Sequence, residues 1–293
     1  MKVVYHWWGF GSCISKSVPV ILSIATLRSV NPKIEIKVVD ISDKQNDDWL
    51  YFQNKLNFEV VKINGKFRDS NHKFWRLFSR IPDVYNNNKQ GTTIYCDSDV
   101  FWLRDPLPLY KNPNKFCFNI WNAGFFYYNK TEEVEKIFSI YERYILATMK
   151  DEKFCETIKY VINKNLKEEK VKSITEIYDE TVLYYLYLTH RELFNVINTE
   201  EHCNINTIYQ TNNPKMFHCN GFKLFNNVTK EKRCPAICCI MFEELYKNMC
   251  DTIGQNEIDM FFNKEELDYY IKKQTPLKEL NNFNKNYNLI KNF

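Results

Sequence analysis

Two aspartates stand one residue apart in the stretch "IYCDSDVFWLRDP" (residues 94–106), directly after a short apolar run. Two carboxylates that point the same way repel each other unless a cation or an arginine joins them. A hard divalent ion that keeps open positions for phosphate oxygens suits Asp97 and Asp99. The alternative is an ordinary strand end whose acids reach water, with Asp99 capping the turn that follows.

The position of this triplet is more informative than its composition, because a chain of this length contains roughly one Asp-x-Asp by chance. Residues two apart in a strand point to the same side. Just past the apolar run, Asp97 and Asp99 could both face the crevice at the carboxyl ends of the strands, where open α/β sheets bind ligands. The position favours a metal site without excluding simple solvation.

Strand-like and helix-like segments alternate in the first half. Apolar or alternating runs predict strands at 2–8, 33–41, 58–63 and 92–103, and helical patterns predict helices at 18–30, 47–56 and 71–85, the last interrupted near Pro82. Repeated strand–helix–strand units imply right-handed crossovers and a mostly parallel sheet. We therefore predict an α/β fold with a Rossmann-like sheet flanked by helices.

The second half is less regular. We expect one or two strands at 115–129, helices at 178–190 and 264–273, a short strand and turn at 213–225, and a solvated helix or loop at 150–172. Another helix, with one apolar face, begins after Asn129, which suits an N-cap with Glu132 at N3. We predict a single domain over residues 1–250 and a helical, polar tail over 251–293.

Composition limits the classes of function. Hydrophobic residues make up 44% of the chain, and a net charge of +4 without a long basic block argues against nucleic acid as a partner. The N-terminus resembles a first strand and not a signal peptide, and no apolar run approaches the roughly 18 residues that cross a bilayer. We expect no transmembrane segment and a cytoplasmic location, with peripheral membrane association left open.

The ten cysteines are scattered, and most lie in apolar runs, as Cys96 does. In a chain without a secretion signal, this usage favours reduced core thiols. A zinc site built from Cys234, Cys238, Cys239 and Cys250 is the alternative, although its spacing is not the paired Cys-x2-Cys form.

The block "FWRLFSRIPDVY…TTIYCDSDVFWLRDPLPLY" (74–110) resembles the central block of glycosyltransferases with the nucleotide-sugar-binding GT-A fold, most closely the glycogenin-like family 8 of retaining transferases. Three later motifs follow in family order. "NAGFFYYN" (122–129) resembles the N-small-G-aromatic strand, "DETVL" (179–183) the acidic motif at a helix start, and "FHCNGFK" (217–223) the H-x-x-G…K turn. Four motifs in order are far more specific than any one; the tail matches none.

The resemblance implies Mn²⁺ or Mg²⁺ held by Asp97, Asp99 and His218. A lone histidine is more often a satisfied core or surface residue, so its context decides. Gly221 would let the backbone approach the diphosphate, and Lys223 would neutralise a phosphate oxygen. Here the chain departs from the family, whose lysine usually falls one residue later and precedes Pro-Trp.

The same resemblance assigns residues to the nucleotide-sugar donor. Arg76 is the expected contact, with Arg80 one turn away as the rival and a solvated helix arginine as the plain alternative. Asn122 and Gly124 would line the donor sugar, or simply form a bulge or turn. The remaining expected donor residues are Ser98 within the triplet and His6 and Trp7 near the N-terminus. An aromatic side chain there, Trp7 or Trp8, could stack on the nucleotide base; the alternative is that it fills the core.

Asp179 and Glu180 are the candidate catalytic residues. Asp179 suits an N-cap and Glu180 a first-turn partner of the helix dipole, which explains both without chemistry. In the family, acids at this place face the sugar and the acceptor, and a cap position that faces the sheet crevice allows both roles. If the reaction inverts configuration, one of the two must be the general base.

The resemblance thus implies a metal-dependent hexosyltransferase that moves a sugar from a nucleoside diphosphate donor, such as a UDP-sugar, to a glycan, glycolipid or protein hydroxyl with retention. A homodimer is compatible with this function. A nucleotidyltransferase should show a basic, Gly-rich loop after the first strand, whereas "HWWGFGSC" holds no Lys or Arg. A catalytically inactive nucleotide-sugar-binding protein is the other alternative, which the presence of all three proposed ligands disfavours.

Overall fold

The computed structural model describes residues 1–7, 14–41, 47–63, 76–88, 90–108, 114–120, 122–197, 202–204, 214–218, 240, 242–274, 276 and 279. Within these residues, seven strands form one sheet in the order β3-β2-β1-β4-β7-β6-β8. They are β1 (Lys2–Trp7), β2 (Glu35–Asp40), β3 (Glu59–Lys62), β4 (Thr92–Cys96), β6 (Phe116–Asn119), β7 (Asn122–Asn129) and β8 (Phe194–Val196).

Most neighbouring strands of this sheet are parallel. β3, β2, β1 and β4 pair in parallel, as do β6 and β8, whereas β7 runs antiparallel to both β4 and β6. The predicted α/β fold with a mostly parallel sheet is therefore confirmed. Because β7 is antiparallel, it begins at the same edge at which β4 ends.

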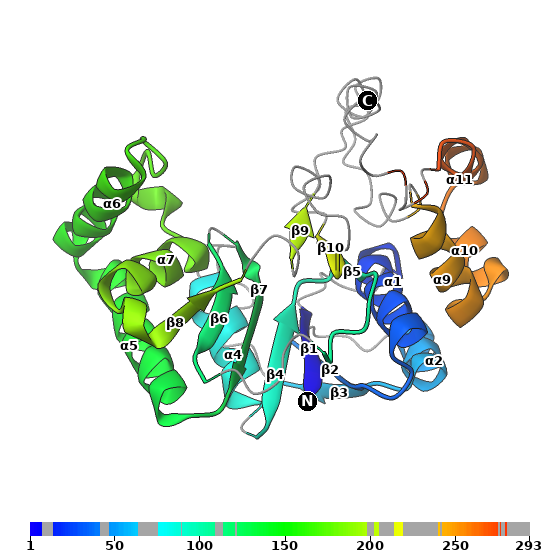
Figure 1. Cartoon of the computed structure of the whole chain (residues 1–293), viewed down its shortest axis with the longest axis horizontal. Helices are drawn as coiled ribbons and strands as arrows, with labels where there is room; N and C mark the ends of the chain where they lie inside the picture. Colours follow the sequence, from blue (N-terminus) through cyan, green and yellow to red (C-terminus); the bar gives the residue numbers. More distant parts are fainter. Residues whose placement is uncertain are drawn as a thin grey trace.

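A second, three-stranded sheet lies beyond that edge. β5 (Val100–Trp102) pairs antiparallel with β10 (Met216–His218), which pairs in parallel with β9 (Cys203–Asn204). The predicted strand at 92–103 is thus two strands that belong to different sheets. Figure 1 shows this small sheet above the ends of β1 and β4.

Alternating side chains give the main sheet two apolar faces, each covered by helices. Tyr5, Val38 and Ile94 belong to the core shared with α1 (Ile14–Val30), α2 (Asp47–Leu56), α9 (Glu243–Ile253), α10 (Gln255–Phe261) and α11 (Lys264–Ile271). Val4 and Tyr95 belong to the core shared with α4 (Ile81–Asn86), α5 (Glu132–Lys150), α6 (Glu152–Leu166) and α7 (Asp179–Thr189). Figure 1 shows α1, α2 and α9–α11 at one end of the molecule and α5–α7 at the other.

Short helical turns complete the described elements. A π-helical turn (Arg76–Arg80) leads into α4, and 3₁₀ turns occupy Ile174–Glu176 and Arg191–Leu193. None of the helices described combines the length and the apolar character that crossing a bilayer requires. Among the described residues, Cys96, Cys117, Cys155 and Cys250 are not in disulfides, and the cysteines at 234–239 of the alternative zinc cluster lie outside the described residues.

The structure defines where three of the predicted helices begin. Thr131, and not Asn129, caps α5: its hydroxyl accepts a hydrogen bond from the Val134 backbone N–H, whereas Asn129 pairs with Thr92 in the sheet. Pro82 lies in the first turn of α4, where its missing N–H costs no α-helical hydrogen bond, directly after the π-helical turn. The predicted interruption near Pro82 is thus a change from π-helical to α-helical geometry. Most of the segment 150–172 is the regular helix α6, capped by Asp151.

The C-terminal helices share the core of the main sheet. α9 runs through residue 250, so the predicted domain boundary at 250/251 falls inside a helix. Ile253, Ile258 and Leu267, all beyond that boundary, are buried in the same cluster as the residues of α1. The helical segment predicted at 264–273 corresponds to α11.

Candidate functional site

Asp97 and Asp99 lie in a tight turn at the carboxyl end of β4. The backbone N–H of Val100 donates to the carbonyl of Asp97 at 3.2 Å, which closes the turn before β5 begins. The carboxylates share a side because of this turn, and not because of the pleat of a continuous strand as the sequence suggested. The N–H of Asp97 donates to the carbonyl of Gly124 at 2.7 Å, which attaches the turn to β7.

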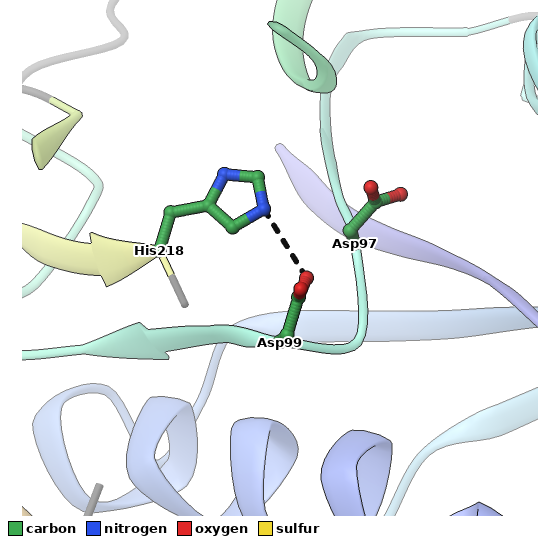
Figure 2. Close-up of side chains that lie close together, drawn as sticks. All are labelled: Asp97, Asp99 and His218. Carbon is green, nitrogen blue, oxygen red and sulfur yellow. Dashed lines mark ion pairs between the residues drawn. The ribbon is translucent and has the colours of Figure 1, made fainter. Parts of the chain in front are cut away.

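β10 brings His218 to this turn from a distant part of the chain. Its antiparallel pairing with β5 places His218 opposite Val100, and so beside Asp99. Nε2 of His218 lies 3.2 Å from Oδ1 of Asp99, and one ligand atom from each of Asp97, Asp99 and His218 lies within 4.8 Å of the others. Figure 2 shows the three side chains converging from the turn and from β10.

Solvent reaches the three side chains unequally. Their exposed fractions are 28% for Asp97, 14% for Asp99 and 3% for His218. Two carboxylates and one imidazole form a donor set suited to a divalent cation, and the partly exposed carboxylates leave room for further oxygen ligands.

Gly124 tests whether these residues fit a cation. A Cβ atom on Gly124 would lie 2.7 Å from Cε1 of His218, 2.9 Å from Oδ1 of Asn122 and closer still to Oδ2 of Asp97. Real Cβ atoms essentially never come so close to other heavy atoms, so a side chain here would push the candidate ligands apart. The bare backbone of β7 therefore lets Asp97 and His218 come together beside Asp99, as a shared cation would require.

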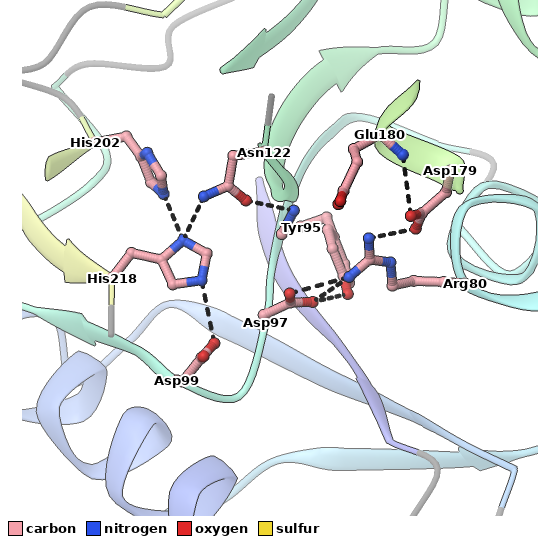
Figure 3. Close-up of polar contacts among 10 residues, drawn as sticks. Arg80, Tyr95, Asp97, Asp99, Asn122, Asp179, Glu180, His202 and His218 are labelled. Atoms are coloured by element: carbon pink, nitrogen blue, oxygen red, sulfur yellow. Dashed lines mark hydrogen bonds and ion pairs between the residues drawn. The ribbon is translucent and has the colours of Figure 1, made fainter. Parts of the chain in front are cut away.

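Arg80 joins the aspartate turn to the start of α7. One terminal nitrogen of its guanidinium donates to both carboxylate oxygens of Asp97, at 3.1 and 3.0 Å, and the other donates to Asp179. Tyr95, which lies on β4 two residues before Asp97, donates its hydroxyl to the same carboxylate. Figure 3 shows Arg80 between the two aspartates.

Burial and charge act in opposite directions on Arg80. Burial alone would lower the pKa of the guanidinium, but the carboxylates of Asp179 and Asp97 outweigh it and raise that pKa well above its usual value. Burial, reinforced by the Asp97 carboxylate, raises the pKa of Tyr95, which stays a neutral hydrogen-bond donor. Arg80 is therefore a permanent positive charge beside Asp97.

Asp179 is the first residue of α7 and is fully buried. Tyr178 occupies the cap position, so the predicted N-cap role of Asp179 is wrong by one residue; its carboxylate accepts instead from Arg80 and from the Glu180 N–H at 3.0 Å. Glu180 is partly buried, and Figure 3 shows its carboxylate pointing toward the pair formed by Arg80 and Asp97.

Asn122 and His202 lie on the other side of His218. Nδ1 of His218 is 3.1 Å from Nδ2 of Asn122 and 2.8 Å from Nε2 of His202. Burial, together with the neighbouring His218, holds the pKa of His202 well below its usual value. Asn122 was expected to line the donor sugar, which stays a prediction, and in this structure it contacts the candidate metal ligand His218.

The remaining predicted residues are spread more widely. Ser98 lies in the aspartate turn and is partly buried. His6 is buried and pairs with Asp83 of α4 at 3.1 Å, and Trp7 is partly buried against the core that includes α1. The side chain of Arg76, together with Trp8, Gly221 and Lys223, lies outside the described residues.

Two site residues could have been found in the sequence, and one could not. Arg80 was considered as the rival of Arg76, and Tyr95 lies on the Asp97 side of its strand by simple alternation. His202 stands in "EEHCNIN" with no periodicity or motif to mark it. Its neighbours, Asn119 and His218, come from other strands, so only the fold reveals it.

No protein-family model and no curated protein matches the chain. Solved structures do match it. Glycosyltransferase GlyE of Streptococcus pneumoniae TIGR4 aligns with a TM-score of 0.52 at 15% identity, over 93% of this chain and 63% of GlyE. Galactosyltransferase LgtC, solved in complex with donor and acceptor sugar analogs, aligns with a TM-score of 0.51 at 12% identity, over 92% of this chain and 100% of LgtC.

These likenesses concern the fold. The chain has the fold of the GT-A glycosyltransferases, as its motifs implied, with the acidic triplet at the carboxyl end of β4. The chain spans 63% of the length of GlyE, a little under two thirds.

Proposed function

We propose that the protein is a metal-dependent glycosyltransferase that moves a sugar, most simply a hexose, from a UDP-sugar to an acceptor hydroxyl of a glycan, glycolipid or protein. The observation that carries the proposal is the convergence of Asp97, Asp99 and His218 in a GT-A fold. These residues come from a turn and from a strand more than a hundred positions away. Simple solvation of a strand end would not bring a buried histidine to the same point.

Asp97, Asp99 and His218 would hold Mn²⁺ or Mg²⁺ in this proposal. When bound, such an ion acts as a Lewis acid that stabilises the negative charge on a leaving diphosphate. The carboxylates repel each other without a positive partner, and Arg80 already neutralises part of that charge on the Asp97 side. Arg80 thereby holds Asp97 in a fixed orientation as a ligand.

Asp179 is poorly suited to be a general base. It is fully buried and its carboxylate is bound to Arg80, so taking a proton would break a buried ion pair. Glu180 is partly buried and is the better placed of the two to face an acceptor. We therefore propose that Asp179 positions Arg80, and that the transfer proceeds with retention, for which no enzymic base is needed on the opposite face of the sugar.

The test is release of UDP from a panel of UDP-sugars, with Mn²⁺ and with a chelator. The wild-type chain is compared with Asp99→Asn, which keeps the shape and removes the charge, and with Asp251→Asn, a matched change at an exposed position on α9. We expect release from one sugar only, dependent on Mn²⁺, and reduced at least 100-fold by Asp99→Asn alone. Water serves as a slow acceptor, so the natural acceptor need not be known.

The other outcomes separate the alternatives. Mn²⁺-dependent UDP binding without release, for every sugar and acceptor tried, would indicate an inactive nucleotide-sugar-binding protein. Release of pyrophosphate from a nucleoside triphosphate would indicate a nucleotidyltransferase. If calorimetry detects no Mn²⁺-dependent binding of UDP, the aspartates are the solvated end of a strand and the proposal fails.

A further inference from the structure

His202 is a buried histidine to which the proposed function assigns no role. It is 2% exposed, and its ring stacks on Phe125 with centroids 5.0 Å apart and an interplanar angle of 12°. Its Nε2 lies 2.8 Å from Nδ1 of His218, and its Nδ1 lies 2.8 Å from Nδ2 of Asn119. A ring rotation would break both polar contacts, so His202 is held in one orientation toward a candidate metal ligand (Figure 3).

Asn122 determines the tautomer of His218 in this structure. Oδ1 of Asn122 accepts a hydrogen bond from the Gly124 N–H at 2.8 Å, so the amide nitrogen of Asn122 faces Nδ1 of His218 at 3.1 Å. An amide nitrogen only donates. Nδ1 of His218 therefore accepts, and Nε2 carries the proton and donates it to Asp99 at 3.2 Å.

A cation at the three ligands requires the other tautomer. Nε2 is the nitrogen of His218 that faces Asp99, and an imidazole nitrogen that binds a metal must offer its lone pair. The neutral ring then carries its proton on Nδ1, which needs an acceptor. Asn122 presents an N–H, so it cannot accept without giving up its bond to Gly124. Nε2 of His202 lies at hydrogen-bonding distance and can accept.

We propose that His202 is a positioning residue for the metal site, whose Nε2 accepts the Nδ1–H of His218 and so holds His218 in the tautomer that binds a cation. The proposal rests on the proposed function, because it concerns the same site. It also follows a general pattern, since the second nitrogen of a metal-bound histidine almost always donates to an acceptor that fixes its tautomer.

The protons balance between the two states. Without a cation, His202 holds the shared proton on Nε2 and donates it to His218. On cation binding, Nε2 of His218 loses its proton to water, the shared proton passes to Nδ1 of His218, and Nδ1 of His202 gains one proton from water. Both rings are neutral before and after. The side-chain amide of Asn119 then flips, so that its oxygen accepts a hydrogen bond from the new Nδ1–H of His202.

The first test measures the affinity of the full chain for MnCl₂ alone by calorimetry, in the wild type and in His202→Gln, His202→Phe and His190→Phe. Gln keeps an acceptor near the place of Nε2, whereas Phe keeps only the ring that packs on Phe125. We expect His202→Phe to weaken Mn²⁺ binding about 10- to 100-fold. We expect near wild-type affinity for His202→Gln and for His190→Phe, which changes a histidine at the far end of α7.

The second test needs no variant and so does not depend on whether His202→Phe folds. Long-range ¹H–¹⁵N spectra of the histidine-labelled wild type are recorded with and without Mg²⁺, which is diamagnetic. We expect His218 to carry its proton on Nε2 without Mg²⁺ and on Nδ1 with it. The diagnostic signal comes from His202 itself, whose own proton should move from Nε2 to Nδ1 when Mg²⁺ binds; a histidine with a merely structural role in the core would keep its proton on Nε2.

The outcomes distinguish this inference from the proposed function. Equal Mn²⁺ affinity in folded His202→Phe and wild type, or a His202 that keeps its proton on Nε2 in the Mg²⁺-bound chain, would overturn the role of His202 and leave the metal site intact. Failure of the wild type to bind either cation would overturn the metal site itself, and the role of His202 with it.

Discussion

Asp97 has two functions at the scale of single residues. Its carboxylate accepts from Arg80 and from Tyr95, yet it also faces Asp99 and His218. A carboxylate offers about four lone-pair sites, so both sets of partners can be satisfied at once. Asp97 therefore connects the candidate metal ligands to the buried pair of Arg80 and Asp179. A substitution in that pair should alter metal affinity, and metal binding should alter the environment of that pair.

Gly124→Ala tests the requirement for a bare backbone beside the ligands. The new Cβ would displace Asp97 and His218, so we expect Mn²⁺ affinity to fall at least 10-fold. The free energy of unfolding should fall by about 1–3 kcal/mol, as for other overpacked sites. Calorimetry and chemical denaturation measure the two effects. Unchanged Mn²⁺ affinity in the folded variant would show that the ligands do not need this close approach.

Arg80 and Asp179 allow a sharper test through a double-mutant cycle. Arg80→Met leaves the buried Asp179 carboxylate without its partner and should cost about 3–5 kcal/mol of stability. In the Arg80→Met background, adding Asp179→Asn removes the uncompensated charge, so the second substitution should stabilise the protein, although it destabilises the wild type. Denaturation midpoints of the four proteins measure this; additive losses would mean that the two side chains do not form an ion pair.

The site could be predicted only where residues fall in motifs. Asp97, Asp99 and His218 were identified because the Asp-x-Asp triplet and the histidine turn follow each other as they do in the family that the sequence resembles. Helical spacing cannot say which turn faces a strand, so Arg76 and Arg80 were rivals. Arg80 makes the contacts described here, and the role of Arg76, whose side chain lies outside the described residues, stays a prediction. His202 was missed because its role depends on a contact across two sheets.

At the scale of elements, the pairing of β5 with β10 builds the site. β5 continues from the aspartate turn into the small sheet, and β10 returns antiparallel to it with His218 opposite Val100. Because side chains alternate along a strand, a slip of one residue would turn His218 away from Asp99. The buried neighbours Met216, Phe217, Phe101 and Trp102 fix the register by packing.

Helix α10 permits a matched comparison of a buried and an exposed residue. Ile258 is fully buried in the core shared with α1, whereas Met260, two residues on, is 75% exposed. Ile258→Ala should lower the free energy of unfolding by about 2–5 kcal/mol, because it leaves a cavity. Met260→Ala should change it by less than about 0.5 kcal/mol. Similar effects in the two variants, measured by denaturation, would mean that α10 does not pack against the domain.

The positions of the helices and strands were predicted better than the residues at which they begin and end. Apolar or alternating runs located β1, β2, β3 and β4. Most residues of β1, β2 and β4 are buried, whereas β3, at the edge of the sheet, is only partly buried. Sequence alone did not separate β4 from β5, because the apolar pattern resumes after only three turn residues. The start of α5 was misplaced because Asn129 and Thr131 are both good caps, and sheet pairing decides between them.

At the scale of the whole molecule, the site lies where the two cores meet. Phe101 and Trp102 of β5 belong to the core with α1, whereas Tyr95 and the start of α7 belong to the core with α5. Arg80 connects the two, because its guanidinium contacts both Asp97 in the aspartate turn and Asp179 at the start of α7. The geometry of the ligands therefore depends on both halves of the fold, including the C-terminal helices that pack on α1.

Truncation tests how far the folded domain extends along the chain. A chain ending at residue 250 loses five buried core side chains: Ile253, Ile258, Phe262, Leu267 and Tyr270. Burial of side chains of this size contributes about 1.5–3 kcal/mol each. The combined loss is comparable to the whole stability of a typical domain, about 5–15 kcal/mol. We therefore expect the chain 1–250 to lose cooperative unfolding or to precipitate.

A chain ending at residue 274 is the matched control, because it keeps all five side chains. We expect it to retain the circular dichroism spectrum of the full chain, a single thermal transition and a shift of that transition to higher temperature on addition of Mn²⁺, since a ligand that binds the native state stabilises it. If the chain 1–250 behaves in the same way, the segment 251–274 is a removable tail, as the sequence first suggested. If only the chain 1–274 keeps the spectrum, the single transition and the shift with Mn²⁺, the helices α10 and α11 are part of the domain that forms the metal site.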